Sequence, residues 1–492
     1  MKKKPILLLL LCVVLLASGC GSKAPDTAVA DLILSNGFIY TVDAGKTTAE
    51  AVAVKDGKII FVGSTADAEQ YKGDATKVID LDGKMLLPSF FEGHGHCQSG
   101  TELLYSCDVS AGKDLAGYLK IIEDFMKENP DAAAIKGSGW VDPVFGAVGP
   151  NKKDLDAICE KLNMDIPIAL YDAGHHSLWV NSKALEIGNI TKDTPNPSSN
   201  SIIQHDPATG EPSGALREGA GDLVLNQLPD YSVEQYEEGI KFYQDMAHSL
   251  GFTGALDALL PAEGNAIEAY KNLEKNGALT MRICGAYSTA PGEDFGAQLK
   301  KFEEARKIDN AGELFQMTTL KFFMDGVIEG ATAYLKDPYA AEAQKGENYR
   351  SEPLWPQEAL NKDFADVEKA GFQIHVHAIG DAGVNEALNA LAYAQDQNGA
   401  SDYRNAITHV QLVEDSDFAR FKNLGVIAAV NPYWAEKDDY YYDLQVPFLG
   451  QERADKEYPI QSFLSHGAMI VTASDFPVTN PPDPLTASVL GV

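Results

Sequence analysis

The chain has 492 residues, with 71 acidic against 40 basic side chains and a formal net charge of −31. Its hydrophobic content of 45% is enough to bury a large core, which argues against a disordered chain. A surface this acidic repels phosphate backbones and anionic lipid headgroups, which argues against nucleic-acid binding and electrostatic membrane adhesion.

The N-terminus carries the pattern of an export signal. Three lysines precede an apolar run from Ile6 to Leu16, and small residues then lead into Cys20. A basic segment, a short apolar core and a small-residue cleavage site are typical of a secretory signal, and the run is shorter than the about 20 residues that span a bilayer. The cysteine after the small residues resembles a bacterial lipobox. We therefore expect a lipoprotein signal over 1–19 and a linker over 20–30, with lipidated Cys20 anchoring the exported chain to the membrane; an uncleaved N-terminal anchor is the alternative.

Residues 31–87 alternate apolar and polar side chains, with turn residues between the runs. Asp56-Gly57 and Asp82-Gly83 each separate two apolar runs, and this dipeptide is typical of a hairpin turn. We expect a small antiparallel β module over 31–87, similar to a β-sandwich.

From residue 88 onward, short apolar strands alternate with amphipathic helical patterns, one of them over 233–250, which indicates parallel βα units. The expected strands are 85–91, 252–257, 281–287, 319–324, 373–378, 406–410, 426–431 and 469–474. Eight strands in a row predict an α/β fold, a (β/α)8 TIM barrel over 88–492. An inserted domain is expected after strand one, over about residues 100–231.

Chemically active side chains gather at the ends of the expected strands, where TIM barrels place their active sites. In chain order these residues are His94, His96, Lys321, His375, His377, His409 and Asp475. Side chains two apart on a strand share a face, so each His-x-His pair can direct both rings to one point. Each residue alone is as easily a packed core side chain. Their order along the strands instead indicates an N/O site for Zn²⁺ or a similar divalent metal.

These motifs resemble the amidohydrolase superfamily, and its YtcJ-like branch in particular, from about residue 31 to the end. The matching segments are Leu87–His96, Gly139-Trp140, His176–Leu185, Leu320–Gly326, His377–Asp381, Thr408–Gln411 and Ser474–Val478. Ser89, Glu92 and Gly93 depart from the family's first-strand motif. The resemblance implies a metal-dependent hydrolase that acts on a non-peptide C–N bond of a small molecule.

The resemblance also implies a ligand set, which is His94, His96, Lys321, His377, His409 and Asp475. The first two histidines would bind the more buried ion and the last two a second ion, with carboxylated Lys321 between them if the site is binuclear. Whether one or two ions bind stays open. Asp475 would be the general base toward the metal-activated water. His375 is expected behind the ligands rather than among them.

Within the insertion, the same resemblance places His176 and Trp140 near the substrate. His176 would be a third catalytic residue, beside Asp475 and Lys321, that stabilises the developing oxyanion, and Trp140 would line the pocket. Packing inside the inserted domain is the alternative for both. Asp325-Gly326 is interpreted as a loop turn, and no motif identifies the substrate.

The family pattern continues beyond strand eight, through a last helix and strands that complete the N-terminal module. The chain ends at Val492, so we expect that helix and those strands to be missing and the β module to show an unpaired edge. A second polypeptide or an oligomer could complete it. The alternative function is a truncated, catalytically weak or inactive surface lipoprotein that binds a small molecule.

Overall fold

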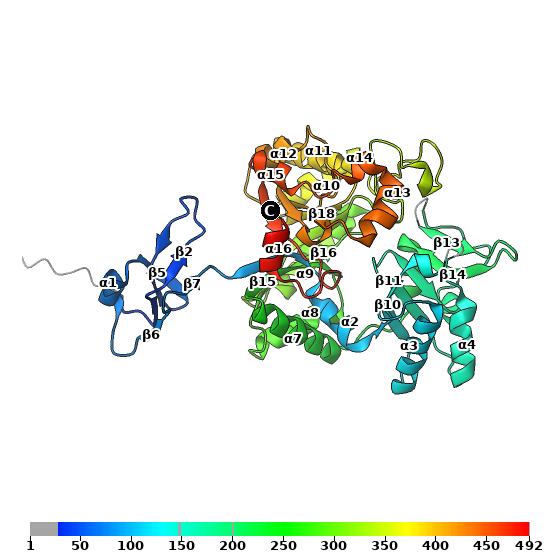
Figure 1. The fold of residues 1–492 in the computed structure, drawn as a ribbon, viewed down its shortest axis with the longest axis horizontal. Helices are drawn as coiled ribbons and strands as arrows, with labels where there is room; N and C mark the ends of the chain where they lie inside the picture. The colour runs from blue at the N-terminus through cyan, green and yellow to red at the C-terminus, as the bar shows by residue number, and fades with distance from the viewer. Residues whose placement is uncertain (1–27, 146–148, 199–200, 492) are drawn as a thin grey trace, which may run out of the picture. The chain divides into compact units, whose positions relative to one another are not determined.

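Figure 1 shows the fold in a computed structural model, which describes residues 28–145, 149–198 and 201–491. The expected signal over 1–19, the lipidation site Cys20 and most of the expected linker lie outside these residues. The chain divides into two compact units, residues 1–89 and 90–492. Among the described residues, no helix is both long and apolar enough to cross a membrane.

The first unit holds two small β-sheets. Its elements are β1 (Leu32–Ser35), β2 (Phe38–Tyr40), β3 (Thr48–Ala49), β4 (Ala51–Lys55), β5 (Lys58–Gly63), α1 (Thr65–Ala68), η1 (Glu69–Tyr71), β6 (Lys77–Asp80) and β7 (Met85–Leu86). One sheet has the order β5-β4-β1-β6 and the other β3-β2-β7. Because β1 pairs with β6, and β2 with β7, in parallel, the expectation of an antiparallel module is wrong in part, and both sheets are mixed.

The two Asp-Gly turns of this unit have the same backbone but different outcomes. Asp56 and Gly57 both have positive φ, 47° and 72°, and connect the antiparallel pair β4 and β5 as predicted. Asp82 and Gly83 have φ of 50° and 72°, yet β6 before them and β7 after them belong to different sheets. The dipeptide therefore sets the local turn, whereas the partners of a strand depend on the rest of the module.

The second unit contains an eight-stranded parallel sheet in the order β8-β15-β16-β17-β18-β19-β20-β21. These strands are β8 (Phe90–Gly95), β15 (Phe252–Leu260), β16 (Arg282–Ser288), β17 (Phe315–Phe323), β18 (Gln373–Ala378), β19 (Ala406–His409), β20 (Ile427–Val430) and β21 (Met469–Thr472). This is the predicted TIM barrel. The bounds of its first strand were predicted wrongly, because residues 85–86 form β7 of the first unit and the barrel strand begins at Phe90.

The ends of this sheet meet beside β8 and just after β21. The amide of Asp475 donates to the carbonyl of His94 (2.8 Å), and the amide of His96 donates to the carbonyl of Phe476 (2.8 Å). A Cβ on Gly93 would lie 2.7 Å from the carbonyl oxygen of Thr472, so glycine is the residue that permits this approach. The departure of Gly93 from the family motif thus has a steric reason.

Helices cover the barrel strands, and Figure 1 shows α7 and α8 along the lower edge of the barrel and α11 and α12 along its upper edge. The main helices of the second unit outside the insertion are α2 (Gly100–Tyr105), α7 (Val233–Ser249), α8 (Asn265–Lys275), α9 (Phe295–Asp309), α10 (Gln357–Lys369), α11 (Asp381–Asn398), α12 (Phe418–Leu424), α13 (Val446–Leu449), α14 (Gln451–Ala454), α15 (Ile460–Ser465) and α16 (Pro484–Leu490). The helix predicted over 233–250 is α7. The hydroxyl of Ser232 accepts a hydrogen bond from the amide of Gln235 and so caps its first turn, while Ile240, Tyr243 and Ala247 are buried.

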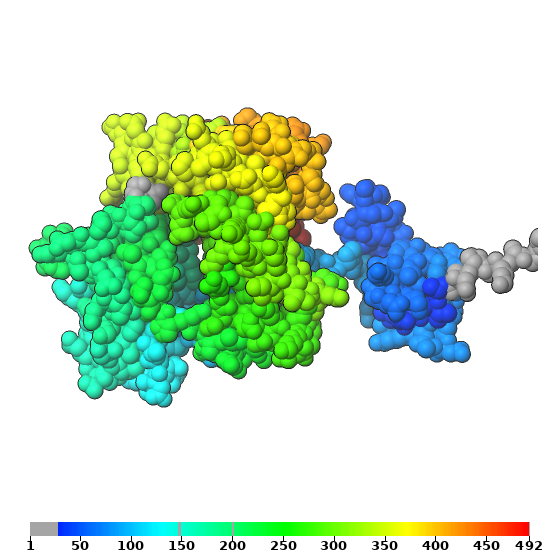
Figure 2. All heavy atoms as spheres, turned by 180° about the vertical axis from the view of Figure 1, so that it is seen from behind, coloured from blue at the N-terminus to red at the C-terminus, as the bar shows by residue number. Residues whose placement is uncertain are grey.

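An inserted sub-domain lies between β8 and β15 and has its own sheet, in the order β13-β14-β12-β11-β10-β9. Its main elements are β9 (Cys107–Asp108), α3 (Leu115–Glu128), β10 (Ile135–Trp140), α4 (Lys152–Leu162), β11 (Ile168–Asp172), β12 (Ser177–Val180), α5 (Ser182–Ile187), β13 (Ile202–His205), β14 (Pro212–Arg217), η5 (Glu218–Ala220) and α6 (Asp222–Leu225). Figure 2 shows a hollow between this sub-domain, coloured cyan to green, and the barrel, coloured green to yellow.

Candidate metal centre

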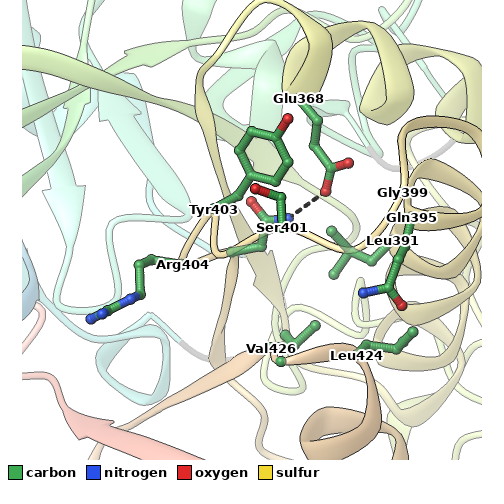
Figure 3. Close-up of a pocket in the computed structure, with 11 residues that line it drawn as sticks. Glu368, Leu391, Gln395, Gly399, Ser401, Tyr403, Arg404, Leu424 and Val426 are labelled. Carbon is green, nitrogen blue, oxygen red and sulfur yellow. Dashed lines mark hydrogen bonds between the residues drawn. The ribbon is translucent and has the colours of Figure 1, made fainter.

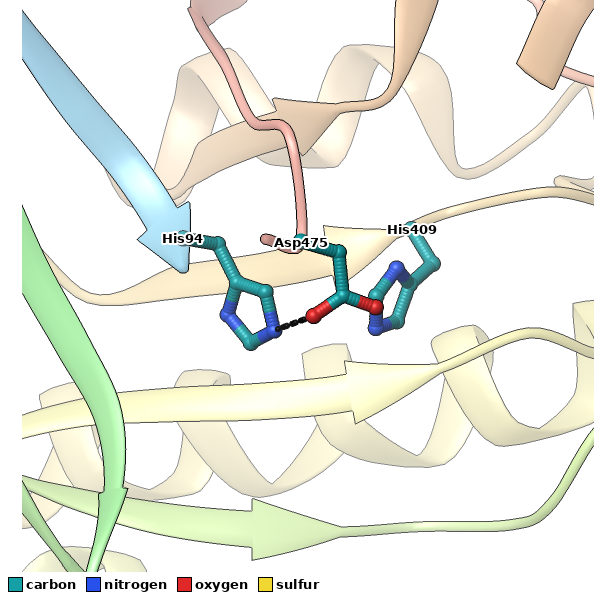
Figure 4. A group of neighbouring side chains, drawn as sticks. All are labelled: His94, His409 and Asp475. Carbon is teal, nitrogen blue, oxygen red and sulfur yellow. Dashed lines mark ion pairs between the residues drawn. The ribbon is translucent and has the colours of Figure 1, made fainter. Parts of the chain in front are cut away.

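Three side chains from distant parts of the sequence converge at the C-terminal ends of the barrel strands. His94 of β8, His409 at the end of β19 and Asp475 after β21 offer ligand atoms that all lie within 4.8 Å of one another (Figure 4). Both histidines are buried. β8 and β21 are the two end strands of the sheet, and hydrogen bonds between β8 and the segment after β21 bring His94 and Asp475 together.

Asp475 lies at the middle of this group. Its Oδ1 is 3.2 Å from Nε2 of His94 and 2.9 Å from Nε2 of His96. Neither nitrogen donates a well-directed hydrogen bond, so this buried oxygen lacks a hydrogen-bond partner among the described residues. Burial opposes ionisation of Asp475, but His94 and His96 outweigh burial and hold the pKa of its carboxyl well below the usual range. The result is an ionised carboxylate whose buried Oδ1 has an unfilled acceptor position.

Lys321 lies on β17 beside this group. It is 1% exposed, and its Nζ is 3.5 Å from Nε2 of His94 and 4.7 Å from the ring centre of Phe323. The described residues contain no ion pair with Lys321. Burial lowers the pKa of its amine to about 7, so a substantial fraction is unprotonated near neutral pH. An unprotonated amine is the form that can be carboxylated.

His409 is held by two neighbours that leave one ring nitrogen free. Its Nδ1 is 3.1 Å from Oδ1 of Asn431, whose Nδ2 donates to the carbonyl of Ala473 (3.1 Å). The amide oxygen of Asn431 must therefore be the acceptor, which places a proton on Nδ1 of His409 and leaves Nε2 as a potential ligand. Trp434 stacks on the ring, with 5.3 Å between centroids and planes 8° apart.

His377 and His375 both come from β18 but have different partners. The ring of His377 is 4.7 Å from that of His409 between centroids, and its Nε2 is 3.1 Å from the carbonyl oxygen of Gly326. His375 lies behind His94, with 2.7 Å between its Nε2 and Nδ1 of His94. This hydrogen bond fixes the ring of His94 and leaves Nε2 of His94 toward Asp475.

The buried histidines of the cluster are neutral. Burial lowers the pKa of His94 to about 3, and it holds the pKa of His375, His377 and His409 well below the ordinary value of 6.5. Neutral imidazole is the form that binds a metal.

Two of the converging residues have an unusual backbone. His409 has φ of 73° and Asp475 has φ of 55°, a region that residues other than glycine rarely adopt. Strain of this kind persists where the surroundings over-determine it, and it is frequent at functional sites.

The two residues of the insertion singled out by the sequence have different surroundings. The ring of His176 is 6.4 Å from that of His377 between centroids, and its Nδ1 is 2.9 Å from Oε2 of Glu218. Trp140 is fully buried in the core of the sub-domain, and its indole nitrogen donates to the carbonyl of Leu170 (2.7 Å). Of the two interpretations kept for these residues, the surroundings of Trp140 match packing and those of His176 match a place beside the cluster.

Sequence reasoning missed Glu92, Asn431 and Glu218. Oε1 of Glu92 accepts hydrogen bonds from the amides of His94 (3.1 Å) and Ser474 (3.0 Å), and burial raises its pKa to about 7. This departure from the family motif thus joins the two end strands of the barrel. Asn431 directly follows the seventh barrel strand, so reading every strand end for polar residues would have found it. No sequence signal pointed to Glu218.

Asp325 has the loop-shaping role expected for it. Its carboxylate accepts hydrogen bonds from the amides of Ile379 (3.0 Å), Gly380 (2.8 Å) and Tyr334 (2.8 Å). These contacts join the loop after β17 to the start of α11.

The other end of the barrel carries a pocket of different character (Figure 3). Its lining residues are Glu368, Leu391, Gln395, Gly399, Ser401, Tyr403, Arg404, Asn405, Leu424, Gly425 and Val426. Asn405 and Val426 directly precede β19 and β20, so this pocket is at the N-terminal ends of the strands. TIM barrels place their active sites at the opposite, C-terminal face, so we expect this end to serve stability rather than catalysis.

Known proteins similar to this chain include members of one enzyme family. A model of the amidohydrolase family matches residues 77–488. The exoenzymes regulatory protein AepA of Pectobacterium carotovorum subsp. carotovorum is 28% identical, covering 91% of this chain and 94% of its own length. YtcJ of Bacillus subtilis (strain 168) is 28% identical over 92% and 82% of the two chains. The N-substituted formamide deformylase of Arthrobacter pascens is 24% identical over 92% and 81%.

The fold has a counterpart among solved structures. The crystal structure of an uncharacterized metal-dependent hydrolase from Pyrococcus horikoshii OT3 aligns with a TM-score of 0.70 at 24% identity. The alignment covers 93% of this chain and 85% of the other. The fold of this chain therefore has a solved counterpart over most of its length.

Proposed function

The chain belongs to the amidohydrolase family and is a YtcJ-like, metal-dependent hydrolase of non-peptide C–N bonds, and on that premise we propose that it cleaves the amide bond of a small molecule with Asp475 as general base. The observation that carries the proposal is the meeting of His94, His409 and Asp475 at one point inside the barrel.

The donor set fits a divalent cation. Neutral imidazoles and one ionised carboxylate are the ligands that Zn²⁺ takes in catalytic sites. The buried Oδ1 of Asp475 faces the Nε2 atoms of His94 and His96 without a hydrogen bond to satisfy it. A cation at this point would satisfy that oxygen. We propose that His94, His96 and Asp475 hold one Zn²⁺, and that His377, His409 and a carboxylated Lys321 hold a second where two are bound.

A divalent metal at this position supplies Lewis acidity toward the substrate carbonyl and lowers the pKa of a coordinated water to about 7. Asp475 accepts the proton of the attacking water, because its low pKa keeps the carboxylate ionised across the neutral range. It then delivers that proton to the departing nitrogen. His176 stabilises the negative charge that develops on the carbonyl oxygen. Asn431 and His375 keep the rings of His409 and His94 in place through these steps.

The substrate class is proposed from a relative. The Arthrobacter pascens protein is named for deformylation of N-substituted formamides, and it shares 24% identity over most of both chains. We propose that the present enzyme acts on an N-formyl or N-acyl derivative of a small amine.

Metal content and product release test the proposal together. The purified chain is loaded with Zn²⁺ and analysed by inductively coupled plasma mass spectrometry, then assayed with p-nitroformanilide and p-nitroacetanilide. We expect one to two Zn²⁺ per chain and release of p-nitroaniline. The His94→Ala/His96→Ala variant should lose both, whereas His248→Ala, at an exposed histidine of α7, should keep both.

The outcomes separate the hydrolase from its rival. A wild-type chain without bound metal would overturn the proposed hydrolase. The alternative, a small-molecule binding protein, would be supported if the chain binds metal and binds a wider panel of N-acyl amines but cleaves none of them.

We also propose that the enzyme is exported and anchored by a lipid on Cys20, facing away from the cytoplasm. The support is the order of basic, apolar and small residues before that cysteine. Incorporation of labelled palmitate in a bacterial host, present in the wild type and absent in Cys20→Ser, is the expected result. Equal labelling of the two chains would contradict the anchor.

A further inference from the structure

A carboxylate outside the candidate metal site links the inserted sub-domain to the barrel. Glu218 follows β14, and its amide donates to the carbonyl of His176 (2.8 Å). Its Oε2 is 2.9 Å from Nδ1 of His176, and its Oε1 accepts a hydrogen bond from Oγ1 of Thr332 (2.8 Å). Thr332 belongs to the loop after β17, the strand that carries Lys321. Each oxygen of Glu218 is therefore engaged by a different part of the unit.

The backbone of Glu218 is held in a costly conformation. Its φ is 49°, in the left-handed region, and its side chain is 19% exposed. The facing loop leaves room for the carboxylate: a Cβ on Gly326 or Gly330 would lie 3.2 Å or 3.1 Å from Oε1 of Glu218. Backbone strain persists only where surrounding contacts over-determine the position, and here both His176 and Thr332 supply such contacts.

His176 is fixed at several atoms, and one ring nitrogen is left over. Its amide donates to Oδ1 of Asp172 (2.8 Å), and its carbonyl and Nδ1 both contact Glu218. For Nε2, the described part of the chain offers no hydrogen-bond partner. The ring is 6.4 Å from that of His377 between centroids, so Nε2 is an unengaged polar atom of the sub-domain close to the candidate metal site.

We propose that Glu218 is a positioning residue for the hydrolysis: by holding Nδ1 of His176 and the hydroxyl of Thr332 at once, it sets the imidazole beside the metal cluster with Nε2–H available to the carbonyl oxygen of the amide. This inference rests on the proposed function. It gives the inserted sub-domain a defined part in the reaction, because the carboxylate that joins the sub-domain to the loop after β17 also positions His176.

Electrostatics agree with this geometry. Burial disfavours a charged ring, but Glu218 outweighs burial, and Asp172 and Glu329 add to its effect, so that the pKa of His176 is raised to about 9. The ring therefore carries protons on both nitrogens at neutral pH. Glu218 stays ionised, since His176 outweighs the effect of burial and lowers the pKa of the carboxyl.

Glu218→Gln tests the proposal, because it keeps the shape of the side chain and removes its charge. With p-nitroformanilide and the Zn²⁺-loaded full chain, we expect kcat to fall about 30- to 100-fold, with KM within about threefold and metal content unchanged. Thr332→Val removes one of the two anchors of the carboxylate and should cost about three- to tenfold in kcat. Glu186→Gln, at an exposed carboxylate of α5 in the same sub-domain, is the matched control and should equal the wild type.

A second readout does not depend on turnover. In the Zn²⁺-loaded chain with ¹⁵N-labelled histidine rings, the signals of His176 are assigned by their absence from His176→Ala. The wild-type ring should titrate above the ordinary value of about 6.5, and Glu218→Gln should lower the pH at which it titrates. Glu218→Asp keeps the negative charge but has a shorter side chain. Its kcat should therefore remain below that of the wild type, although the carboxylate is ionised.

The two hypotheses fail differently. Wild-type kcat together with wild-type titration of His176 in Glu218→Gln overturns the role of Glu218, and so does full activity in Glu218→Asp. If Glu218→Gln does not fold, Thr332→Val with unchanged kcat and titration overturns it equally. Absence of metal and of product in the wild-type chain overturns the proposed function, while the titration still tests the Glu218–His176 contact.

Discussion

The two ends of the same barrel strands treat buried polar groups in opposite ways. At the N-terminal ends, Glu368 accepts hydrogen bonds from Asn405 (2.8 Å) and Asn398 (3.3 Å), and Asn405 also accepts from the amide of Ile374. At the C-terminal ends, Oδ1 of Asp475 and Nδ1 of His375 are buried without hydrogen-bond partners among the described residues. One end is satisfied internally, and the other is left with unmet donors and acceptors.

This difference separates stability from function within one scaffold. Buried polar groups that lack partners cost folding free energy, and a bound ligand or a reaction that uses them is one way to offset that cost. At the N-terminal end, the buried polar groups described above bind one another. At the C-terminal end, buried donors and acceptors remain available to a bound ligand such as a metal ion. Substitutions at the two ends should therefore have opposite consequences.

The largest effect is expected at Asp475. Asp475→Asn keeps the volume but removes the charge and the base, so kcat/KM for p-nitroformanilide should fall about 10³- to 10⁴-fold. Steady-state kinetics on the Zn²⁺-loaded variant measure this loss. A fall of less than about tenfold would place the general base elsewhere in the cluster.

Lys321→Met should lower kcat/KM by about 10²-fold or more if the site needs the carboxylated lysine. The same substitution should stabilise the metal-free chain. A buried cationic residue without an ion pair is replaced by an apolar one of similar length, which we expect to raise the free energy of unfolding by about 1–3 kcal/mol at pH 7. Urea unfolding of the metal-free proteins measures this difference. Lower stability of the variant would mean that the amine is better satisfied than its surroundings indicate.

The pH dependence of that difference gives its cause. The pKa of Lys321 is about 7 in the folded chain and about 10.5 in the unfolded chain. Between these values the unfolded chain binds the extra proton, so the wild type gains stability as pH rises from 7 toward 10.5. The advantage of Lys321→Met should therefore shrink across this window. An advantage that stays constant with pH would point to packing rather than charge.

Glu368→Ala should have the smallest effect on activity. Unlike the first two variants, it should lower stability and leave turnover nearly unchanged. It leaves the amides of Asn405 and Asn398 without their carboxylate partner at the N-terminal end, which should cost about 1–3 kcal/mol of stability. The kcat of the folded protein should remain within twofold of the wild type, as measured below the melting temperature. A large loss of kcat would show that the two ends of the barrel are coupled.

The sequence predicted the barrel well because its signal is local and repeated. Each strand is a short apolar run followed by a helical pattern, and motifs such as His94-Gly95-His96 end the strands on which they lie. The parallel pairing of β1 with β6 could not be predicted this way, because it depends on contacts between residues far apart in the chain.

The candidate site shows the same division. His94, His409 and Asp475 stand in motifs that the sequence displays directly, and the structure places them in one cluster. Asn431 follows a barrel strand and could have been found at that position. Glu218 acts by contact with His176, and such a contact has no spacing or composition by which to identify it. The place of Trp140 in the sub-domain core likewise depends on packing partners that the sequence leaves open.

The contact between β8 and the segment after β21 gives the barrel a seam that coincides with its reactive centre. The amide of Asp475 bonds to the carbonyl of His94 at this seam, and the side chains of both residues belong to the cluster. Any fluctuation that parts the two end strands also pulls Asp475 away from His94 and His96. Loss of turnover on heating is therefore a sensitive report of the seam opening, and it should precede the loss of secondary structure.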